Sequence, residues 1–334
     1  MKTKAEKPVC KIVHTLPDFV QAICDERTSF VHEGLLRNEI PLFRGQPDES
    51  FTLLPSLVRN RQTEFDIDLF NLEHSLIAMA SYKYPELFNK NLLPIERLTL
   101  LQHYGIPTRL LDVTENCLVA LYFACCGMDS KNGEVFMFKV NEQRVNDFPI
   151  LQAIADSSTL CNGATLISLE SFYDHAKQRP YFTEFQAPVS FIKSSENALS
   201  LWIKSIVEHP IFIHAPYQTL RQRLQQSRYI LFSNELETIE GTESKCPQTY
   251  FKSNISAIPK DESCIAARFI VPHSDKEKIL EQLKMFGICR ETLFADSPDI
   301  VCEEIKKDAL NSLKVEPAPE GSTKSVHWYA HEHM

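Results

Sequence analysis

Apolar residues recur every three or four positions in several segments, and this spacing predicts helices. Pro17 and Pro94 each stand in the first turn of such a segment, where proline is favoured. Thr114, followed by a polar pair and then an apolar run, predicts an N-terminal cap, and Ser274 with Glu277 predicts a capping box. We therefore predict a helix opening at Thr15 and helices over residues 64–82, 94–103, 116–126, 165–178, 196–207, 274–287 and 297–310.

Short apolar runs bounded by glycine or proline predict strands. The run GEVFMFKV is apolar almost throughout, as expected of a strand buried on both faces. The predicted strands cover residues 40–45, 133–140, 210–216, 229–233 and 264–272, with residues 218–228 as a polar helical or extended approach to the fourth and residues 234–262 as a polar loop.

Helices and strands are mixed without strict alternation, which favours an α+β fold over a doubly wound parallel sheet. We expect a single mixed domain with a central β-sheet flanked by helices. The expected organisation is an N-terminal extension at residues 1–15, the domain at residues 16–312 and a flexible tail at residues 313–334.

Composition narrows the classes of protein. The 334 residues carry a net charge of −9, which argues against a dedicated duplex DNA binder. No apolar run reaches the roughly 18 residues of a membrane span, and the first residues lack the apolar centre of a secretion signal. The ten cysteines are scattered without a CxxC pair, and the tail histidines read as incidental. We expect a cytoplasmic protein with reduced thiols and no metal site.

Arg44 and Gly45 end the first predicted strand of the domain. An arginine there can present its planar fork to a phosphate or carboxylate, and the glycine lets a ligand or another backbone come close. The alternative is a structural salt bridge at the strand end.

The stretch LLQHYGIPTRLLDVT gathers polar groups of several kinds around a Gly and a Pro that predict a fixed turn. His103 titrates near neutral pH, and Tyr104 offers a flat ring and a hydroxyl. Thr108 and Arg109 add hydrogen-bonding groups. Asp112 can pair with Arg109, in which case the pair only stabilises the loop. We interpret the stretch as a ligand-facing turn held by the buried helix that follows it.

A third polar cluster, RQRLQQSRY, precedes the strand predicted at residues 229–233. It is either a solvated helix face or a group of amides and guanidinium groups that faces the same pocket, and spacing alone leaves both readings open. Its members are Arg221, Arg223, Gln225, Gln226 and Arg228.

The order of these motifs resembles the FRG domain family, which is named for a Phe-Arg-Gly motif, here Phe43, Arg44 and Gly45. The second motif, QHYGIPTRLLDVT, has Val113 where the family usually has Trp. RQRLQQSRYIL, with Ser227 where Gly is common, and FGICRETLFADSPDIVCEEI match later parts. The resemblance covers roughly residues 16–310. It implies a bacterial or phage setting and says little about the function of the protein.

A more distant similarity is to ADP-ribosyltransferases, in which an early strand carries an aromatic-Arg-Gly, a second motif supplies Ser, Thr or Tyr, and a late strand supplies Glu. The order here is Arg44, then Tyr104 to Thr108, then Gln225. This similarity implies NAD as substrate, with Arg44 on phosphates or ribose and Tyr104 stacked on nicotinamide. Gln225 is neutral, so it stabilises positive charge poorly, and Glu235 and Glu237 are candidate substitutes.

Three functions are therefore in competition. The first is an NAD-consuming enzyme, either an ADP-ribosyltransferase or an NAD glycohydrolase. The second is a non-catalytic nucleotide- or anion-binding module, and the third is a metal-independent nuclease or hydrolase using His103 with Asp112. The acceptor and the oligomeric state stay open, and no membrane partner is expected.

These hypotheses share one set of candidate residues. We expect Arg44, Tyr104, Thr108, Arg109 and Gln225 to line one cleft. The candidate catalytic residues are Arg44, Tyr104, Thr108 and Gln225, and the candidate nucleotide-binding residues are Arg44, Gly45, His103, Arg109 and Asp112.

Overall fold

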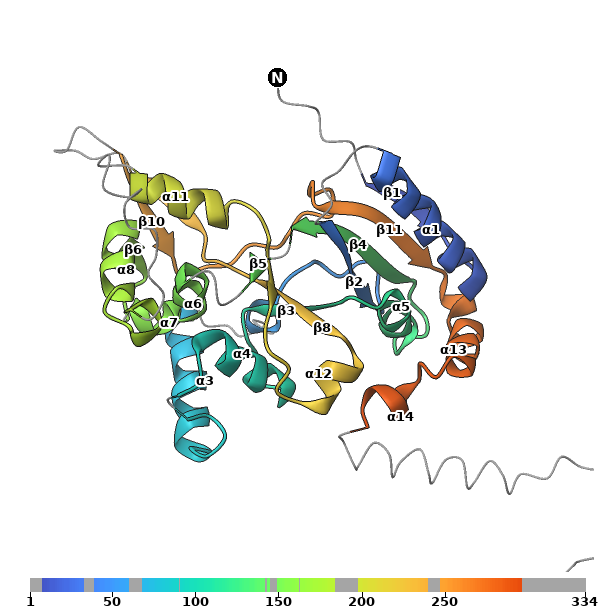
Figure 1. Cartoon of the computed structure of the whole chain (residues 1–334), viewed down its shortest axis with the longest axis horizontal. Helices are drawn as coiled ribbons and strands as arrows, with labels where there is room; N and C mark the ends of the chain where they lie inside the picture. Colours follow the sequence, from blue (N-terminus) through green and yellow to red (C-terminus); the bar gives the residue numbers. More distant parts are fainter. Residues whose placement is uncertain are drawn as a thin grey trace, which may run out of the picture.

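Strands and helices are mixed along the chain in the computed structural model, and helices flank one large central sheet (Figure 1). The α+β class and the central sheet predicted from the sequence are confirmed. The structure describes residues 8–32, 39–59, 68–89, 91–141, 143–144, 149–161, 163–183, 198–239 and 247–295. The helix predicted at residues 297–310 and the tail at residues 313–334 lie outside these ranges.

The central sheet has the strand order β1-β11-β4-β2-β3-β8-β7-β5, and a small sheet has the order β6-β10-β9. In the central sheet β1–β11 and β5–β7 are parallel pairs and the other pairs are antiparallel. The strands are β1 (Val9–Ile12), β2 (Glu39–Gln46), β3 (Leu110–Thr114), β4 (Gly133–Asn141), β5 (Gln143–Arg144), β6 (Leu166–Ser168), β7 (Ile211–His214), β8 (Ser227–Leu231), β9 (Leu236–Ile239), β10 (Gln248–Lys252) and β11 (Ile265–Val271).

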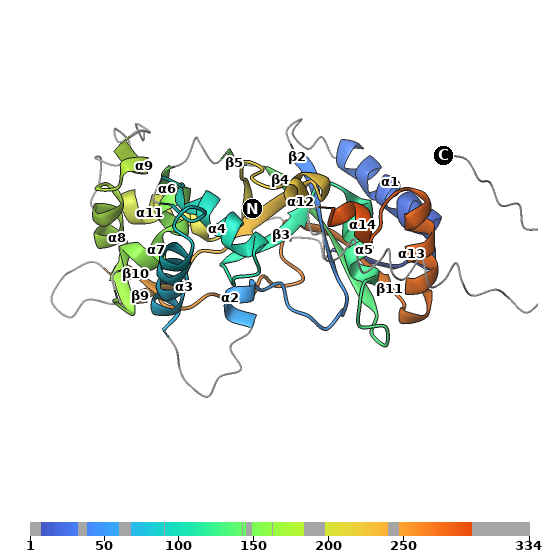
Figure 2. The same cartoon turned by 90° about the horizontal axis from the view of Figure 1, so that it is seen from below.

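The helices gather at the two ends of this sheet, as the view from below shows (Figure 2). Helices α1 and α13 lie beside β11 at one end, and α3, α4, α6, α7, α8, α9 and α11 lie at the other. The helices are α1 (Leu16–His32), α2 (Ser56–Arg59), α3 (Leu69–Lys83), α4 (Pro94–His103), α5 (Cys117–Cys125), α6 (Pro149–Ala155), α7 (Ser157–Leu160), α8 (Leu169–Ala176), α9 (Pro180–Thr183), α11 (Ala198–Val207), α12 (Leu220–Leu224), α13 (Lys276–Met285) and α14 (Arg290–Leu293).

The middle of the central sheet is split. Strands β2 and β4 are paired over eight residue pairs, whereas β2 and β3 meet in a single pair, Phe43 with Thr114. β3 in turn pairs with β8 along its whole length. Because the two halves of the sheet separate beyond Phe43, side chains can occupy the space between β2 and β3.

Helix α5 lies directly on the split sheet. Its side chains from Val119 to Tyr122 are buried, as the all-round apolar sequence predicts. Gly45 on β2 and Gly133 on β4 let it approach this closely. A Cβ atom built on Gly45 would lie 1.7 Å from the carbonyl oxygen of Ala120, and one on Gly133 would lie 2.1 Å from that of Ala124. The helix backbone therefore touches the strand backbone at both glycines.

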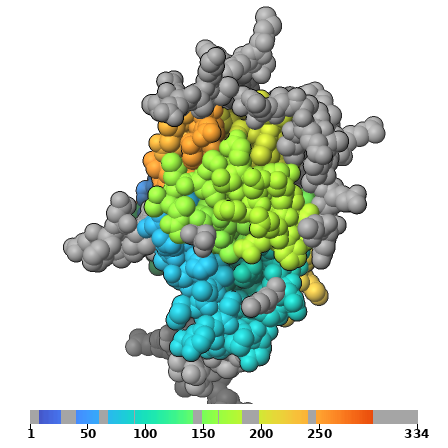
Figure 3. All heavy atoms as spheres, turned by 90° about the vertical axis from the view of Figure 1, so that its left-hand side faces the viewer, coloured from blue at the N-terminus to red at the C-terminus, as the bar shows by residue number. Residues whose placement is uncertain are grey.

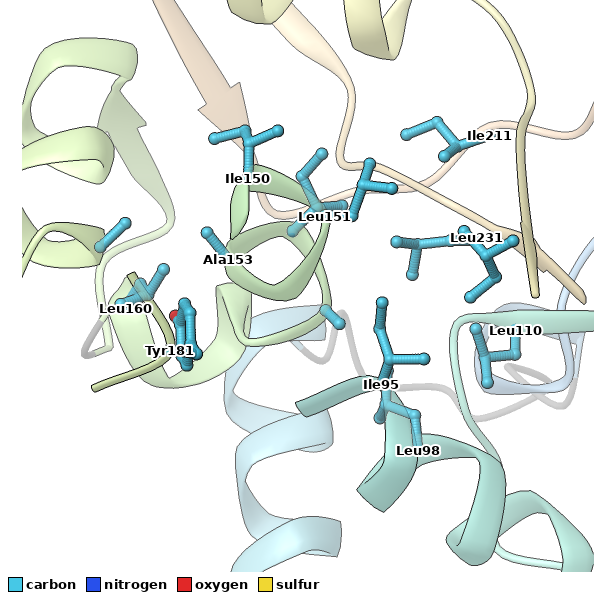
Figure 4. Packing of buried hydrophobic residues seen from close by; sticks show 14 of the residues in the cluster. Ile95, Leu98, Leu110, Ile150, Leu151, Ala153, Leu160, Tyr181, Ile211 and Leu231 are labelled. Carbon is cyan, nitrogen blue, oxygen red and sulfur yellow. The ribbon is translucent and has the colours of Figure 1, made fainter. Parts of the chain in front are cut away.

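The apolar core divides into three clusters. One joins α5, α1, α13 and α14 to β2, β4 and β11, and a second covers the other face of these strands with Leu53, Leu57, Ile255 and Ile258. The third fills the helical end: Ile95 and Leu98 of α4 lie beside Leu110 of β3 (Figure 4). Figure 3 shows the surface of this end, where residues of α3 and α4 adjoin those of α6 to α9.

Several local predictions are corrected. Strand β1 lies within the expected N-terminal extension, and β6 occupies the start of the helix predicted at residues 165–178. Strands β9 and β10 lie in the expected loop at residues 234–262: they pair with each other, and β10 also pairs with β6, in a sheet separate from the large one.

The two predicted helix caps are also wrong. The side chain of Asn116, not Thr114, caps α5 by accepting from the N–H of Leu118. A 3₁₀ turn at His273–Asp275 occupies the predicted capping box, and α13 starts at Lys276. Lys276 is buried and donates to three backbone carbonyls, those of Pro47, Gly127 and Met128. This lysine joins α13 to the segments that follow β2 and α5.

No helix within the described ranges is long and apolar enough to cross a membrane.

The contact at Gly45 generates a prediction. Gly45→Ala places a methyl group inside the van der Waals radius of the Ala120 carbonyl oxygen, so α5 must move off the sheet. We expect a loss of several kcal/mol in the free energy of unfolding, as for severe overpacking (about 1–3 kcal/mol or more). Urea unfolding measures this loss.

Gly105→Ala is the matched control, because Gly105 has φ +78° but no atom within 4 Å of a built Cβ. Its loss should stay near about 1 kcal/mol, the cost of a left-handed alanine. Equal midpoints for Gly45→Ala and wild type would contradict the close packing of α5.

Candidate functional site

A cleft of about 320 Å³ opens where β2 and β3 separate. The end of β2, strand β3 and the start of β8 line it, together with α5, α12 and the last residues of α4. Figure 1 shows where these elements lie in the fold. Its apolar wall includes Phe43, Val119 and Phe123. Its polar lining residues are Arg44, Gln102, His103, Asp112, Thr114, Arg221, Gln222, Gln225, Ser227 and Tyr229.

Arg44 bridges the split in the sheet. Its Nη1 donates to the backbone carbonyl of Asp112 across 2.6 Å, at the point where β2 and β3 no longer form a regular ladder. Its Nε is buried and has no hydrogen-bond partner among the described residues. Burial lowers the pKa of the Arg44 guanidinium to about 10, and the Asp112 carboxylate offsets only part of this effect. Arg44 therefore stays protonated at neutral pH, as a half-buried and desolvated cation on the wall of the cleft.

The opposite wall carries the carboxylate of Asp112. Asp112 is the exposed residue of β3, and it lies directly opposite Tyr229 in the ladder with β8. Burial raises the pKa of the Tyr229 hydroxyl, which accepts a hydrogen bond from Nε2 of Gln222 at 3.1 Å. The tyrosine is thus a neutral, fixed support, and Asp112 supplies negative charge beside Arg44.

A tight turn between α12 and β8 forms the rim of the cleft. Gln226 has φ +47°, and the hydroxyl of Thr114 donates to the carbonyl of Gln225 across 2.7 Å. The side-chain amide of Gln225 donates to the carbonyl of Leu293 at 3.1 Å. A capping box between Thr219 and Gln222 starts α12. These bonds fix α12 relative to β3 and α14.

The structure brings together five of the residues proposed from the sequence. Arg44, Gly45, His103, Asp112 and Gln225 all line the cleft, although they come from four separate segments of the chain. Gly45 also serves the close approach of α5 and so has a packing role of its own.

Arg109 does not line the cleft, which corrects its expected position. Its guanidinium is fully buried and forms a salt bridge with Glu73 of α3, with Nε donating to the carboxylate at 2.8 Å. Nη1 also donates to the side chain of Asn234 at 2.9 Å. The pairing with Asp112 considered from the sequence is wrong, because Arg109 precedes β3 and points into the core between α3 and the end of β8.

Thr108 and Tyr104 also lie outside the cleft lining. Thr108 is 1% exposed; its hydroxyl donates to Gln102 and accepts from the N–H of Leu110, so it stabilises the turn into β3. The ring of Tyr104 is 54% exposed and lies edge-on to Phe88 and His103. The expectation that Arg44, Tyr104, Thr108, Arg109 and Gln225 share one cleft therefore holds for Arg44 and Gln225 alone.

The substitutes considered for Gln225 lie elsewhere. Glu235 lines a second cavity of about 300 Å³ beyond the other end of β8, and Glu237 belongs to β9 in the small sheet. Arg228 is buried and pairs with Glu115 and the hydroxyl of Tyr217. None of these residues lines the first cleft.

Arg221 is the cation of the third cluster that lines the cleft, and the sequence motifs did not distinguish it from the other arginines of that cluster. Its neighbour Arg223 is exposed and does not line it. The helical period of α12 was the available signal, because residues two positions apart face different directions on a helix. Within the described residues, no group of three or more His, Cys, Asp or Glu side chains has the arrangement of a metal site.

Comparison with protein families identifies residues 39–133 as an FRG domain. This match spans β2 to the start of β4, and so includes Arg44, Gly45, His103 and Asp112. No curated protein and no solved structure matches the chain. The matched region therefore supplies the walls that carry Arg44 and Asp112, and Arg221 and Gln225 lie outside it.

The buried pair of Arg109 and Glu73 generates a prediction about stability. Glu73→Gln leaves the Arg109 charge uncompensated, which should cost about 3–5 kcal/mol of the free energy of unfolding. Calorimetric or urea unfolding measures it. The double variant Glu73→Leu with Arg109→Met should recover most of the loss, because no buried charge is left.

The exposed pair of Lys177 and Asp174 provides the control, since both side chains are about half exposed or more. Asp174→Ala should change stability by less than about 1 kcal/mol. A small effect of Glu73→Gln, similar to that of Asp174→Ala, would show that Arg109 is not held as a buried ion.

Proposed function

We propose that the FRG domain of this chain forms part of a nucleotide-binding cleft that cleaves NAD, as a glycohydrolase or ADP-ribosyltransferase. The observation that carries the proposal is the state of Arg44: its buried Nε has no partner among the described residues, and its Nη1 donates to a backbone carbonyl. A desolvated cation is costly unless anions compensate it, and the Asp112 carboxylate offsets only part of the desolvation of Arg44. An anionic ligand in the cleft would supply that compensation.

The charges around the cleft favour a phosphate-bearing ligand. Arg44 and Arg221 line it from β2 and from α12, so two guanidinium groups approach from different sides. Guanidinium groups bind phosphate oxygens with paired, charge-assisted hydrogen bonds. The cleft volume of about 320 Å³ is at the lower end of the range for ligand pockets, about 300–1,000 Å³. One half of a dinucleotide would be enclosed, and the other half would extend along the rim.

Asp112 is the group proposed for the chemical step. When the bond between C1′ of the ribose and the nicotinamide nitrogen breaks, its electron pair leaves with nicotinamide and positive charge develops on the sugar. A carboxylate beside the sugar stabilises this charge. Water, or an acceptor group, then adds to C1′ and loses a proton. We assign this role to Asp112 rather than to Gln225, because Gln225 is neutral and its side-chain amide donates a hydrogen bond to the carbonyl of Leu293.

Incubation with NAD and measurement of free nicotinamide tests this activity. Asp112→Asn should lower the rate on the order of 100-fold, as the loss of one stabilising group does, with little change in nucleotide affinity. Arg44→Met should weaken nucleotide binding by roughly 10- to 100-fold, through loss of a charged hydrogen-bonding group. Its melting temperature should stay near that of wild type, since methionine removes a desolvated charge.

Arg223→Met is the matched control for Arg221→Met, because both arginines are on α12 and Arg221 alone of the two lines the cleft. Only Arg221→Met should weaken binding. NAD or ADP-ribose binding without nicotinamide release would instead identify a non-catalytic nucleotide-binding module. Absence of both binding and release would refute the proposal.

A second candidate is a metal-independent hydrolase of phosphate esters. Its support is that His103 lines the same cleft as Asp112 and two arginines, so an acid–base pair and phosphate-binding groups share one space. His103→Asn separates the candidates. It should abolish phosphate-ester hydrolysis if His103 is the acid or base, and it should leave nicotinamide release largely intact.

A further inference from the structure

The last described residues of the chain pack against α12, on the rim of the cleft. The guanidinium carbon of Arg221 lies 4.4 Å from the ring centroid of Phe294, which is a cation–π contact. The same ring lies edge-on to Phe123 of α5, with centroids 6.3 Å apart. Phe294 thus touches a side chain on each of two walls of the cleft, without lining the cleft itself.

Helix α12 needs such support. It has five residues, and both Leu220 and Leu224 are substantially exposed, so the helix contributes few side chains to the core. It is held by the cap on Thr219, by the buried Gln222 and by the bonds made by Gln225. A long side chain in its middle has many rotamers in such a position, and ordering it on binding lowers affinity.

Helix α14 supplies the support from a firm base. Leu293 is 2% exposed and belongs to the core cluster around α5. Its carbonyl accepts the side-chain amide of Gln225 at 3.1 Å, which ties α12 to that core. The next residue is Phe294, so the position of its ring follows from the anchored residue before it.

We propose that Phe294 is a positioning residue that holds the Arg221 guanidinium in the orientation that binds an anionic ligand. This inference rests on the proposed function in one respect, that the ligand is anionic. It extends the site beyond the matched family region, residues 39–133, to the end of the described chain. The ring touches no ligand in this arrangement and acts only through Arg221.

Two substitutions separate positioning from simple packing. Phe294→Leu keeps an apolar side chain against Phe123 but removes the π face under Arg221. Phe294→Tyr keeps the ring and its face. A residue that only fills the core is served equally by leucine, whereas a residue that orients a cation needs an aromatic ring.

Calorimetric titration with ADP-ribose, on the full chain, tests the proposal. We expect Phe294→Leu to weaken binding roughly three- to tenfold and Phe294→Tyr to bind within about twofold of wild type. Adding Phe294→Leu to Arg221→Met should cause no further loss, because the ring acts through the arginine. Thermal melts confirm that each variant is folded, and Phe294→Met replaces Phe294→Leu if the latter does not fold.

The outcomes are distinguishable from those for the proposed function. If wild type binds ADP-ribose and Phe294→Leu binds equally well, the positioning role is overturned and the anionic cleft stands. Independent, additive losses from Arg221→Met and Phe294→Leu overturn it as well. If wild type binds neither ADP-ribose nor NAD, both the cleft function and the role of Phe294 are refuted.

Discussion

The contact between the backbone of α5 and the backbones of β2 and β4 is the constraint on which the rest of the structure depends. It exists because Gly45 and Gly133 carry no side chain at the two points where the strands meet the helix. With α5 so close, most of its side chains are buried, and Val119 and Phe123 become one wall of the cleft. The glycine of the Phe-Arg-Gly motif therefore shapes the site through packing, and the arginine beside it faces the space that this packing leaves.

The cleft itself follows from incomplete pairing. β2 and β3 share one residue pair, and an unpaired stretch of sheet must satisfy its polar groups in another way. Arg44 does so for the carbonyl of Asp112, at the cost of desolvating a charge whose Nε has no partner among the described residues. A regular ladder between β2 and β3 would leave no room for the cleft or for the Arg44 side chain between the strands. The break in the sheet and the desolvated Arg44 cation are thus two consequences of one arrangement.

Two arginines in neighbouring motifs show how much of the site the local sequence can predict. Arg44 and Arg109 both stand in the motifs that suggest a binding site, Arg44 after Phe43 and Arg109 after Thr108. Arg44 lines the cleft, whereas Arg109 is buried against Glu73, a residue of α3 that lies 36 positions earlier. The difference depends on which helix supplies the carboxylate that meets Arg109, and nothing in the residues around Arg109 specifies that helix. The expected position of Tyr104 is wrong for a related reason. The sequence at the end of a helix does not specify where the last side chain points.

The sequence by itself determined the elements whose signal is local. The apolar run of β4, the proline-started helix α4 and the fully apolar α5 all lie where the spacing of apolar residues and the flanking Gly and Pro residues predict them. Pairing between distant segments decided the rest. β1 and the small sheet exist because of partners far along the chain, and the cleft assembles residues from β2, β3, α4 and α12. Periodicity records which face of one element is buried, but only tertiary packing decides which polar side chains from separate elements meet in one space.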